Sequence, residues 1–150
     1  MAPGPGGVRG TATSCIVADF FDTNVVVYAF DSDEPEKREI AQALLRDHAD
    51  AVISTQVLLE WFSVVTRQFS PPLPTVRART ALEALSQLDV VPADAELVVR
   101  AAETSVAHPL SIWDAMIVES AAVAGCGTLW SEDLSDGAVI RGVRIQNPFG

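Results

Sequence analysis

The sequence predicts an α/β fold, in which a central, mainly parallel sheet is covered by helices on both faces. Short apolar runs typical of buried strands alternate along the chain with longer stretches whose apolar residues recur at helical spacing. Strands and helices that alternate in this way form β-α-β units, which place helices on both faces of a parallel sheet. The 150 residues, of which 49% are hydrophobic, are enough to bury one core. Because neither an internal repeat nor a second domain is evident, we expect a single domain.

The domain is expected to span residues 15–150, after a leader rich in Gly, Pro and small polar residues at 1–14 (MAPGPGGVRGTATS) that reads as flexible. Its first part carries two strand–helix pairs. An apolar run at 15–21 predicts a strand and is followed by a helix at about 35–49. The second pair is a short strand at 51–54 with a helix at 56–68, and the sequence SPPLP then breaks the chain sharply.

The second part is expected to contain a helix at 75–85, a strand at 89–91, helices at 94–107 and 111–124, and strands at 127–130 and 143–146. Prolines and glycines mark the boundaries. Pro92 opens the helix after the third strand and Pro109 ends it, and Gly125 stops the next helix. The order of these elements completes the alternating pattern.

Charge and hydropathy exclude several classes of protein. Ten Lys and Arg residues against twenty Asp and Glu residues give a net charge of −10, which argues against a broad basic platform for nucleic acid. No apolar run approaches the roughly 18 residues that a membrane-spanning helix needs. Asp19 interrupts the first apolar run, so the N-terminal part does not resemble a secretory signal. We therefore expect a cytoplasmic protein without a membrane partner.

The cysteines and histidines predict neither a disulfide nor a zinc site. Cys15 and Cys126 lie far apart within apolar stretches, so both are expected to be buried free thiols. His48 and His108 lack the paired spacing of a closed zinc site. Both histidines are expected at the surface or at helix ends.

Four carboxylates interrupt apolar sequence, whereas most of the other acidic residues lie in polar loops or on solvated helix faces. Asp22 follows the first predicted strand, and Asp133 follows the strand at 127–130. Glu60 lies on the apolar face of its helix, and Asp114 leans inward one turn into another helix. The carboxyl ends of parallel strands converge on one crevice, so these four side chains are expected to meet there.

Each carboxylate also has a simpler interpretation. Asp22 could cap the helix that follows it, Asp114 could complete a capping-box-like pattern, and Asp133 could be a turn residue. Glu60 has no such local role, and its alternative is an ion pair with an arginine. A fifth carboxylate, Asp19, is interpreted as an edge or structural residue.

A cluster of four carboxylates requires cations or raised pKa values. Two unit charges 4 Å apart repel by about 4 kcal/mol at an effective dielectric of 20. Oxygen ligands without His or Cys select hard ions, so Mg²⁺ is expected, with Mn²⁺ as a substitute. Such an arrangement is typical of enzymes that act on phosphates, in which one ion activates water and a second can stabilise the leaving oxygen.

At these residues the sequence resembles the PIN-domain ribonucleases, and in particular the VapC-type toxins of type II toxin–antitoxin systems. The motifs that carry the resemblance are FDTNV at 21–25, STQVLLE at 54–60, IWDAMIV at 112–118, LWSEDL at 129–134 and the ending GVRIQNPF at 142–149. It extends over nearly the whole chain, from about residue 16 to residue 149.

The resemblance implies a PIN-like three-layer α/β/α sandwich with a central parallel sheet, usually a homodimer, that cleaves RNA with Mg²⁺. Its partner would be a small antitoxin that occupies the active-site groove. By motif, the principal metal ligands would be Asp22 and Asp114, and the other two acidic positions Glu60 and Asp133. The residues matching polar positions that orient ligands, water or phosphate are Thr23, Asn24 and Ser131.

The expected function is therefore that of a metal-dependent endoribonuclease, the toxin of a toxin–antitoxin pair. One alternative is a PIN-like scaffold that binds a partner without catalysis. Another is a phosphotransferase with an aspartyl nucleophile, but the only lysine, Lys37, lies in an early polar helix rather than late in the sheet. RNA would be held by arginines outside the leader and the last strand, with these candidates: Arg46, Arg67, Arg77, Arg79 and Arg100.

Overall fold

The computed structural model describes residues 17–150, so the predicted leader and Cys15 lie outside the described residues. It confirms the predicted α/β class. The strands are β1 (Asp19–Phe21), β2 (Val52–Ser54), β3 (Asp89–Val91), β4 (Thr128–Trp130), β5 (Val139–Ile140) and β6 (Val143–Gln146). The helices are α2 (Thr23–Tyr28), α3 (Pro35–Asp47), α4 (Thr55–Arg67), α5 (Thr75–Leu85), α6 (Ala95–Ala107) and α7 (Ile112–Val123).

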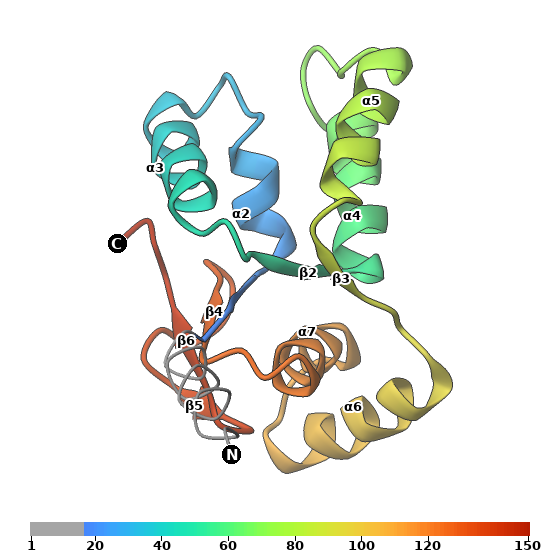
Figure 1. The fold of residues 1–150 in the computed structure, drawn as a ribbon, viewed down its shortest axis with the longest axis vertical. Coiled ribbons are helices and arrows are strands. Elements are labelled where there is room, and N and C mark those ends of the chain that lie inside the picture. Colours follow the sequence, from blue (N-terminus) through green and yellow to red (C-terminus); the bar gives the residue numbers. More distant parts are fainter. Residues whose placement is uncertain (1–16) are drawn as a thin grey trace, which may run out of the picture.

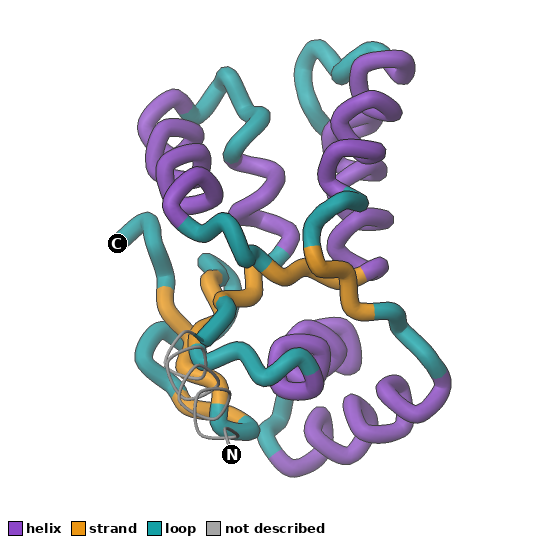
Figure 2. The backbone as a smooth tube through the Cα atoms, viewed as in Figure 1, coloured by secondary structure: helices purple, strands orange, loops and turns teal. Residues whose placement is uncertain are grey.

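These strands form one sheet in the order β3-β2-β1-β4-β6-β5. All neighbouring pairs are parallel except β5 and β6, which pair antiparallel. Helices α2 to α5 lie on one side of the sheet, and α6 and α7 lie on the other (Figure 1). The strands, drawn in orange in Figure 2, thus form the middle layer of a three-layer α/β/α arrangement.

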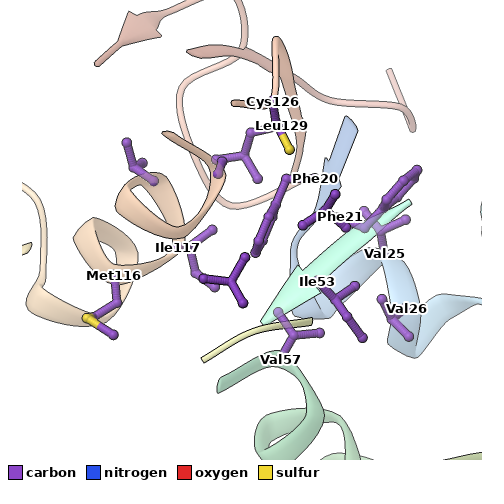
Figure 3. Packing of buried hydrophobic residues seen from close by; sticks show 14 of the residues in the cluster. Phe20, Phe21, Val25, Val26, Ile53, Val57, Met116, Ile117, Cys126 and Leu129 are labelled. Carbon is purple, nitrogen blue, oxygen red and sulfur yellow. The ribbon is translucent and has the colours of Figure 1, made fainter. Parts of the chain in front are cut away.

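The core fills both faces of the sheet because successive side chains of a strand point to opposite sides. Phe20 lies on the α7 side with Ile117, whereas Phe21 lies on the α2 side with Val25 (Figure 3). All four side chains are at most 2% exposed. The two phenylalanines of β1 therefore fix the helical layers on either side of the strand that directly precedes Asp22.

Most predicted elements are found within two residues of their expected bounds, but three details differ. The first strand is shorter than expected, because only Asp19–Phe21 pair with β4. Helix α2 was not predicted as an element. Strand β5 was also missed; it is joined to β6 by a tight turn in which Arg141 and Gly142 have φ angles of 55° and 79°.

The position of Asp19 differs from the expected sheet edge, and its side chain contacts Trp130 and His48. It lies in β1, an internal strand, so its placement at a sheet edge is wrong. Trp130 Nε1 donates a hydrogen bond to Asp19 Oδ2 (3.0 Å), and His48 Nε2 lies 2.9 Å from the same oxygen. His48 and His108 are the C-cap residues of α3 and α6, which confirms their expected position at helix ends.

Two further expectations concern the thiol and the membrane. Cys126 is a free thiol and 4% exposed, as predicted. Burial, reinforced by nearby carboxylates, raises the pKa of the Cys126 thiol to about 12. None of the helices formed by residues 17–150 combines the length and the apolar character needed to cross a membrane.

Candidate functional site

The site is built where β1 and β4, neighbouring parallel strands, end at the same level. Phe21 is in register with Trp130, and the Asp22 amide donates to the Trp130 carbonyl (3.0 Å). The residues that follow the two strands, Asp22 on one side and Ser131 on the other, therefore lie side by side. This is the convergence predicted for the carboxyl ends of parallel strands.

Asp22 is the most buried of the four predicted carboxylates, with 6% of its surface exposed. Its Oδ1 accepts from the Thr23 amide (2.7 Å), so it does cap α2, and its Oδ2 accepts from Ser131 Oγ (2.8 Å). Burial raises the pKa of Asp22 to about 6, even though both hydrogen bonds favour the anion. The charges of Asp133 and Glu60 raise it further. The capping role and the site role thus coexist.

Asn24 and Ser131 connect Asp22 to Asp133. Asn24 Nδ2 donates to Asp133 Oδ2 (3.0 Å) and lies 3.5 Å from Asp22 Oδ2. The Asp133 amide donates to Ser131 Oγ (3.1 Å), the hydroxyl that also serves Asp22. The Asp133 side chain itself is exposed, as an interpretation as a turn residue requires, yet it faces the same crevice.

Glu60 reaches the crevice from α4. Thr23 Oγ1 donates to Glu60 Oε1 (2.7 Å), and Gln56 Nε2 lies 3.3 Å from Glu60 Oε2. Among residues 17–150 no arginine or lysine forms an ion pair with Glu60, so the alternative of an arginine partner is wrong. Sequence reasoning missed Gln56, although its position four residues before Glu60 on one helix was a usable signal.

Asp114 lies in the first turn of α7, and its amide donates to the N-cap hydroxyl of Ser111 (3.0 Å). Its side chain is partly buried, and burial raises the pKa of its carboxyl, while a side-chain hydrogen bond with Ser111 lowers it. Asp133 and Glu60 add to this increase. Since Asp22 is influenced by the same two carboxylates, all four predicted residues share one electrostatic environment.

Two of the four carboxylates, Glu60 and Asp133, line an open crevice rather than a closed cage. A cavity of about 620 Å³ between α2 and α4 is lined by Thr23, Asn24, Glu60 and Asp133, and also by Asp31, a residue expected to be an ordinary loop carboxylate. Within the described chain, no three Asp, Glu, His or Cys side chains come close enough together to enclose a metal ion. The residues nevertheless fit a hard cation that keeps several waters, because every donor is an oxygen and no basic side chain from residues 17–150 forms an ion pair with the four anions.

These observations define the class of protein. It has a three-layer α/β/α fold with an acidic crevice at the carboxyl edge of its sheet. The family model of the PIN domain matches residues 20–135, which include all four carboxylates. The chain therefore belongs to the PIN domain family. No curated protein sequence matches it significantly.

Solved structures with the same fold include toxin–antitoxin proteins. A chain of the toxin–antitoxin complex from Klebsiella pneumoniae aligns with a TM-score of 0.67 and 20% identity, covering 87% of this chain and 98% of that one. VapC20 from Mycobacterium tuberculosis, described as a sarcin–ricin loop cleaving toxin, aligns with a TM-score of 0.61 and 20% identity over 75% of this chain and 87% of its own. A chain of the DNA-bound VapBC complex from Salmonella typhimurium aligns with a TM-score of 0.62 and 20% identity, covering 89% of this chain and 99% of that one.

Proposed function

We propose that this chain is a metal-dependent endoribonuclease that acts as the toxin of a type II toxin–antitoxin pair. The observation that carries the proposal is a set of four carboxylates that influence one another electrostatically and have no ion pair with a basic side chain among residues 17–150. A buried anion such as Asp22 destabilises a fold unless a cation or hydrogen-bond donors compensate its charge, which supports a cation-binding role for this set. VapC20 shares the fold and is described as a sarcin–ricin loop cleaving toxin, which supports RNA as the substrate class.

In the proposed mechanism, Asp22 and Asp114 are the principal ligands of Mg²⁺ or Mn²⁺, with Glu60 and Asp133 as the further acidic positions. The bound ion would supply activation of a water and neutralisation of charge on the scissile phosphate. Ser131 keeps the Asp22 carboxylate aimed into the crevice by donating to its Oδ2. The chain's remaining task is to hold the RNA so that water and phosphate lie in line.

The polar residues around the carboxylates orient them. Thr23 fixes the rotamer of Glu60 through a 2.7 Å hydrogen bond. Asn24 donates to Asp133 and, with its own carbonyl oxygen, accepts from the backbone of the β4–β5 connection. Asp22, Glu60 and Asp133 thereby each keep at least one carboxylate oxygen directed by the protein, which reduces the entropy lost when a cation binds.

Phosphate contacts away from the cation would come from exposed arginines. Arg67 lies at the C-terminal end of α4, the helix that carries Glu60, and Arg77 and Arg79 lie on the adjacent α5. Arg100 is a weaker candidate because it pairs with Glu96 at 3.0 Å. The chain has only ten Lys and Arg residues and a net charge of −10, so we expect weak general affinity for nucleic acid.

The partners and setting of the protein belong to the same proposal. Two of the solved structures with the same fold are a toxin–antitoxin complex and a DNA-bound VapBC complex, so a small antitoxin is the expected protein partner. We propose that the toxin is a cytoplasmic homodimer. Light scattering of the purified toxin measures the dimer, and co-purification with the product of an adjacent small gene identifies the antitoxin.

The test of the proposed activity is cleavage of total RNA by purified protein, free of antitoxin, in Mg²⁺ or Mn²⁺. We expect discrete RNA fragments that disappear in EDTA and in the Asp114→Asn variant. Titration of Mn²⁺, followed by its paramagnetic resonance signal, measures binding independently of activity. Cation binding without cleavage would favour the PIN-like scaffold, and cleavage in EDTA would refute the role of the metal.

The aspartyl phosphotransferase alternative loses its chemical basis, because Lys37 is paired with Glu132 rather than directed at Asp22. Incubation with acetyl phosphate followed by mass spectrometry tests this alternative, and we expect no phosphorylated aspartate.

A further inference from the structure

The single lysine of the chain is attached to the connection that carries two residues of the site. Glu132 lies between Ser131 and Asp133, and both of its carboxylate oxygens are bound. Lys37 Nζ, from α3, lies 2.5 Å from Glu132 Oε2, and the Tyr28 hydroxyl, from the end of α2, donates to Oε1 (2.7 Å). Two helices that precede β2 in the chain thus bind one side chain that follows β4.

The ammonium group of Lys37 is held on more than one side. It lies 3.3 Å from the Tyr28 hydroxyl, 4.7 Å from the centre of the Tyr28 ring and 5.6 Å from the ring of Phe149. The two rings pack edge to face with centroids 4.9 Å apart. Only 33% of the Lys37 side chain and 25% of the Glu132 side chain are exposed. This pair is therefore better defined than an ordinary surface ion pair, whose contribution is small.

The backbone at the same place is connected to the crevice. The Glu132 amide donates to Asn24 Oδ1 (3.2 Å), and the next amide, of Asp133, donates to Ser131 Oγ (3.1 Å). Asp133 is exposed, and the hydrogen bond from Asn24 Nδ2 is the one that orients its carboxylate. Its position therefore depends on where the backbone of the β4–β5 connection is held.

We propose that Lys37, together with Tyr28, acts as a positioning residue for RNA cleavage by anchoring Glu132 and thereby fixing Ser131 and Asp133. The inference rests on the proposed nuclease function but assigns a role to residues outside the carboxylate set. Displacement of an orienting group by about 1 Å can reduce a rate by up to about a hundredfold. Removal of the anchor should therefore lower kcat without removing a group that contacts RNA.

The structural part of the proposal is tested by hydrogen exchange. In Lys37→Met, which keeps the aliphatic stem, amide exchange at Glu132 and Asp133 should become about tenfold faster, because the segment opens locally. Exchange in β1 and β4 should stay unchanged. The matched control is Arg38→Met, which removes a positive charge from the next residue of the same helix. Unchanged exchange at 131–133 in Lys37→Met would overturn the proposal, whether or not the protein is a nuclease.

The functional part is tested by steady-state cleavage of one RNA oligonucleotide in Mg²⁺. We expect kcat to fall about tenfold or more in Lys37→Met and in Glu132→Gln, with KM little changed. The double variant should be no worse than either single variant, because both break one interaction. Lys37→Arg should retain most of the activity, and the reversed pair Lys37→Glu/Glu132→Lys should recover part of it.

These outcomes separate anchoring from general electrostatics. Equal losses in Lys37→Met and Arg38→Met would attribute the effect to net charge and overturn the proposal. A rise in KM alone would assign Lys37 to RNA binding instead and would also overturn it. If the parent protein does not cleave RNA, the proposed function fails, while the exchange experiment still decides whether Lys37 fixes this segment.

Discussion

Replacing Asp22 with asparagine measures how much this carboxylate of the candidate site lowers the free energy of unfolding. The pKa of this carboxyl rises from an ordinary 3.8 to about 6, mainly through burial. One pKa unit corresponds to about 1.36 kcal/mol, so the difference of 2.2 units corresponds to about 3 kcal/mol of unfavourable free energy when the group is ionised. Asparagine is neutral and keeps one oxygen for the Thr23 amide. Allowing about 1 kcal/mol for the weaker bond to Ser131, Asp22→Asn should stabilise the metal-free protein by about 2 kcal/mol at pH 8.

The pH dependence has a definite sign. Below pH 3.8 the Asp22 carboxyl is protonated in both the folded and the unfolded state, so its raised pKa does not change the free energy of unfolding. Between 3.8 and about 6 the folded state binds more protons than the unfolded state, so stability falls as pH rises, and above this window the full cost is present. The difference in stability between Asp22→Asn and the parent should therefore grow from pH 4.5 to pH 8.

Urea denaturation in EDTA, followed by circular dichroism at both pH values, measures this difference. The matched control is Asp94→Asn, the same change at the N-cap of α6, where the side chain accepts from the Leu97 amide (2.9 Å) in an exposed setting. Asparagine and aspartate are about equal as caps, so this variant should change stability by less than about 0.5 kcal/mol. Saturating Mg²⁺ should stabilise the parent protein but not Asp22→Asn, and should therefore reduce the difference in unfolding free energy between them. A less stable Asp22→Asn protein at pH 8 would refute the reasoning.

Three other expectations concern single side chains. In a Cys15→Ser background, Cys126 should react with a maleimide at pH 8 only slowly while the protein is folded and rapidly in urea, because burial raises its thiol pKa to about 12; equal rates would show that the thiol is accessible. Arg141→Ala should lower the stability of the protein in urea, because it leaves the carboxylate of Glu119, 2% exposed, with the Thr104 hydroxyl but without the guanidinium now 2.8 Å away, and a second change, Glu119→Gln, should recover part of the loss. Thr23→Val should lower kcat for RNA about tenfold by removing the hydroxyl that orients the α4 carboxylate, whereas Thr23→Ser should keep most of the activity; equal kcat values for the two variants would contradict this role.

The elements predicted from the sequence were those whose apolar pattern is long enough to be distinctive. Helix α2 entered the prediction only as a helix that Asp22 could cap and was given no bounds, because its six residues, TNVVVY, are rich in β-branched valines, which favour strands over helices. Strand β5 has two residues and depends on a turn with positive φ angles at Arg141 and Gly142, of which only the glycine is a usual signal.

The candidate site was predictable to the extent that its residues break an apolar pattern. Asp22 and Glu60 stood out because a charge on a buried face needs a cause. Lys37 and Glu132 did not stand out, because each lies among polar residues, where charged side chains are ordinary. They lie 95 positions apart, and only the folding of α3 onto the end of β4 makes them partners.

The position of β4 in the sheet determines at which stage of protein synthesis the complete site can form. Strand β4 lies directly beside β1, yet the hydrogen bond from Ser131 to Asp22 joins residues 109 positions apart. During synthesis, α2 to α5 can pack on β1, β2 and β3 while the other edge of β1 is still bare and the acidic site lacks its Ser131–Asp133 segment. The arrangement on which the proposed activity depends therefore cannot form until residues 131–133 have left the ribosome. A nascent or truncated chain that ends before β4 should carry Asp22 without the groups that orient it, and should be inactive towards the RNA around it.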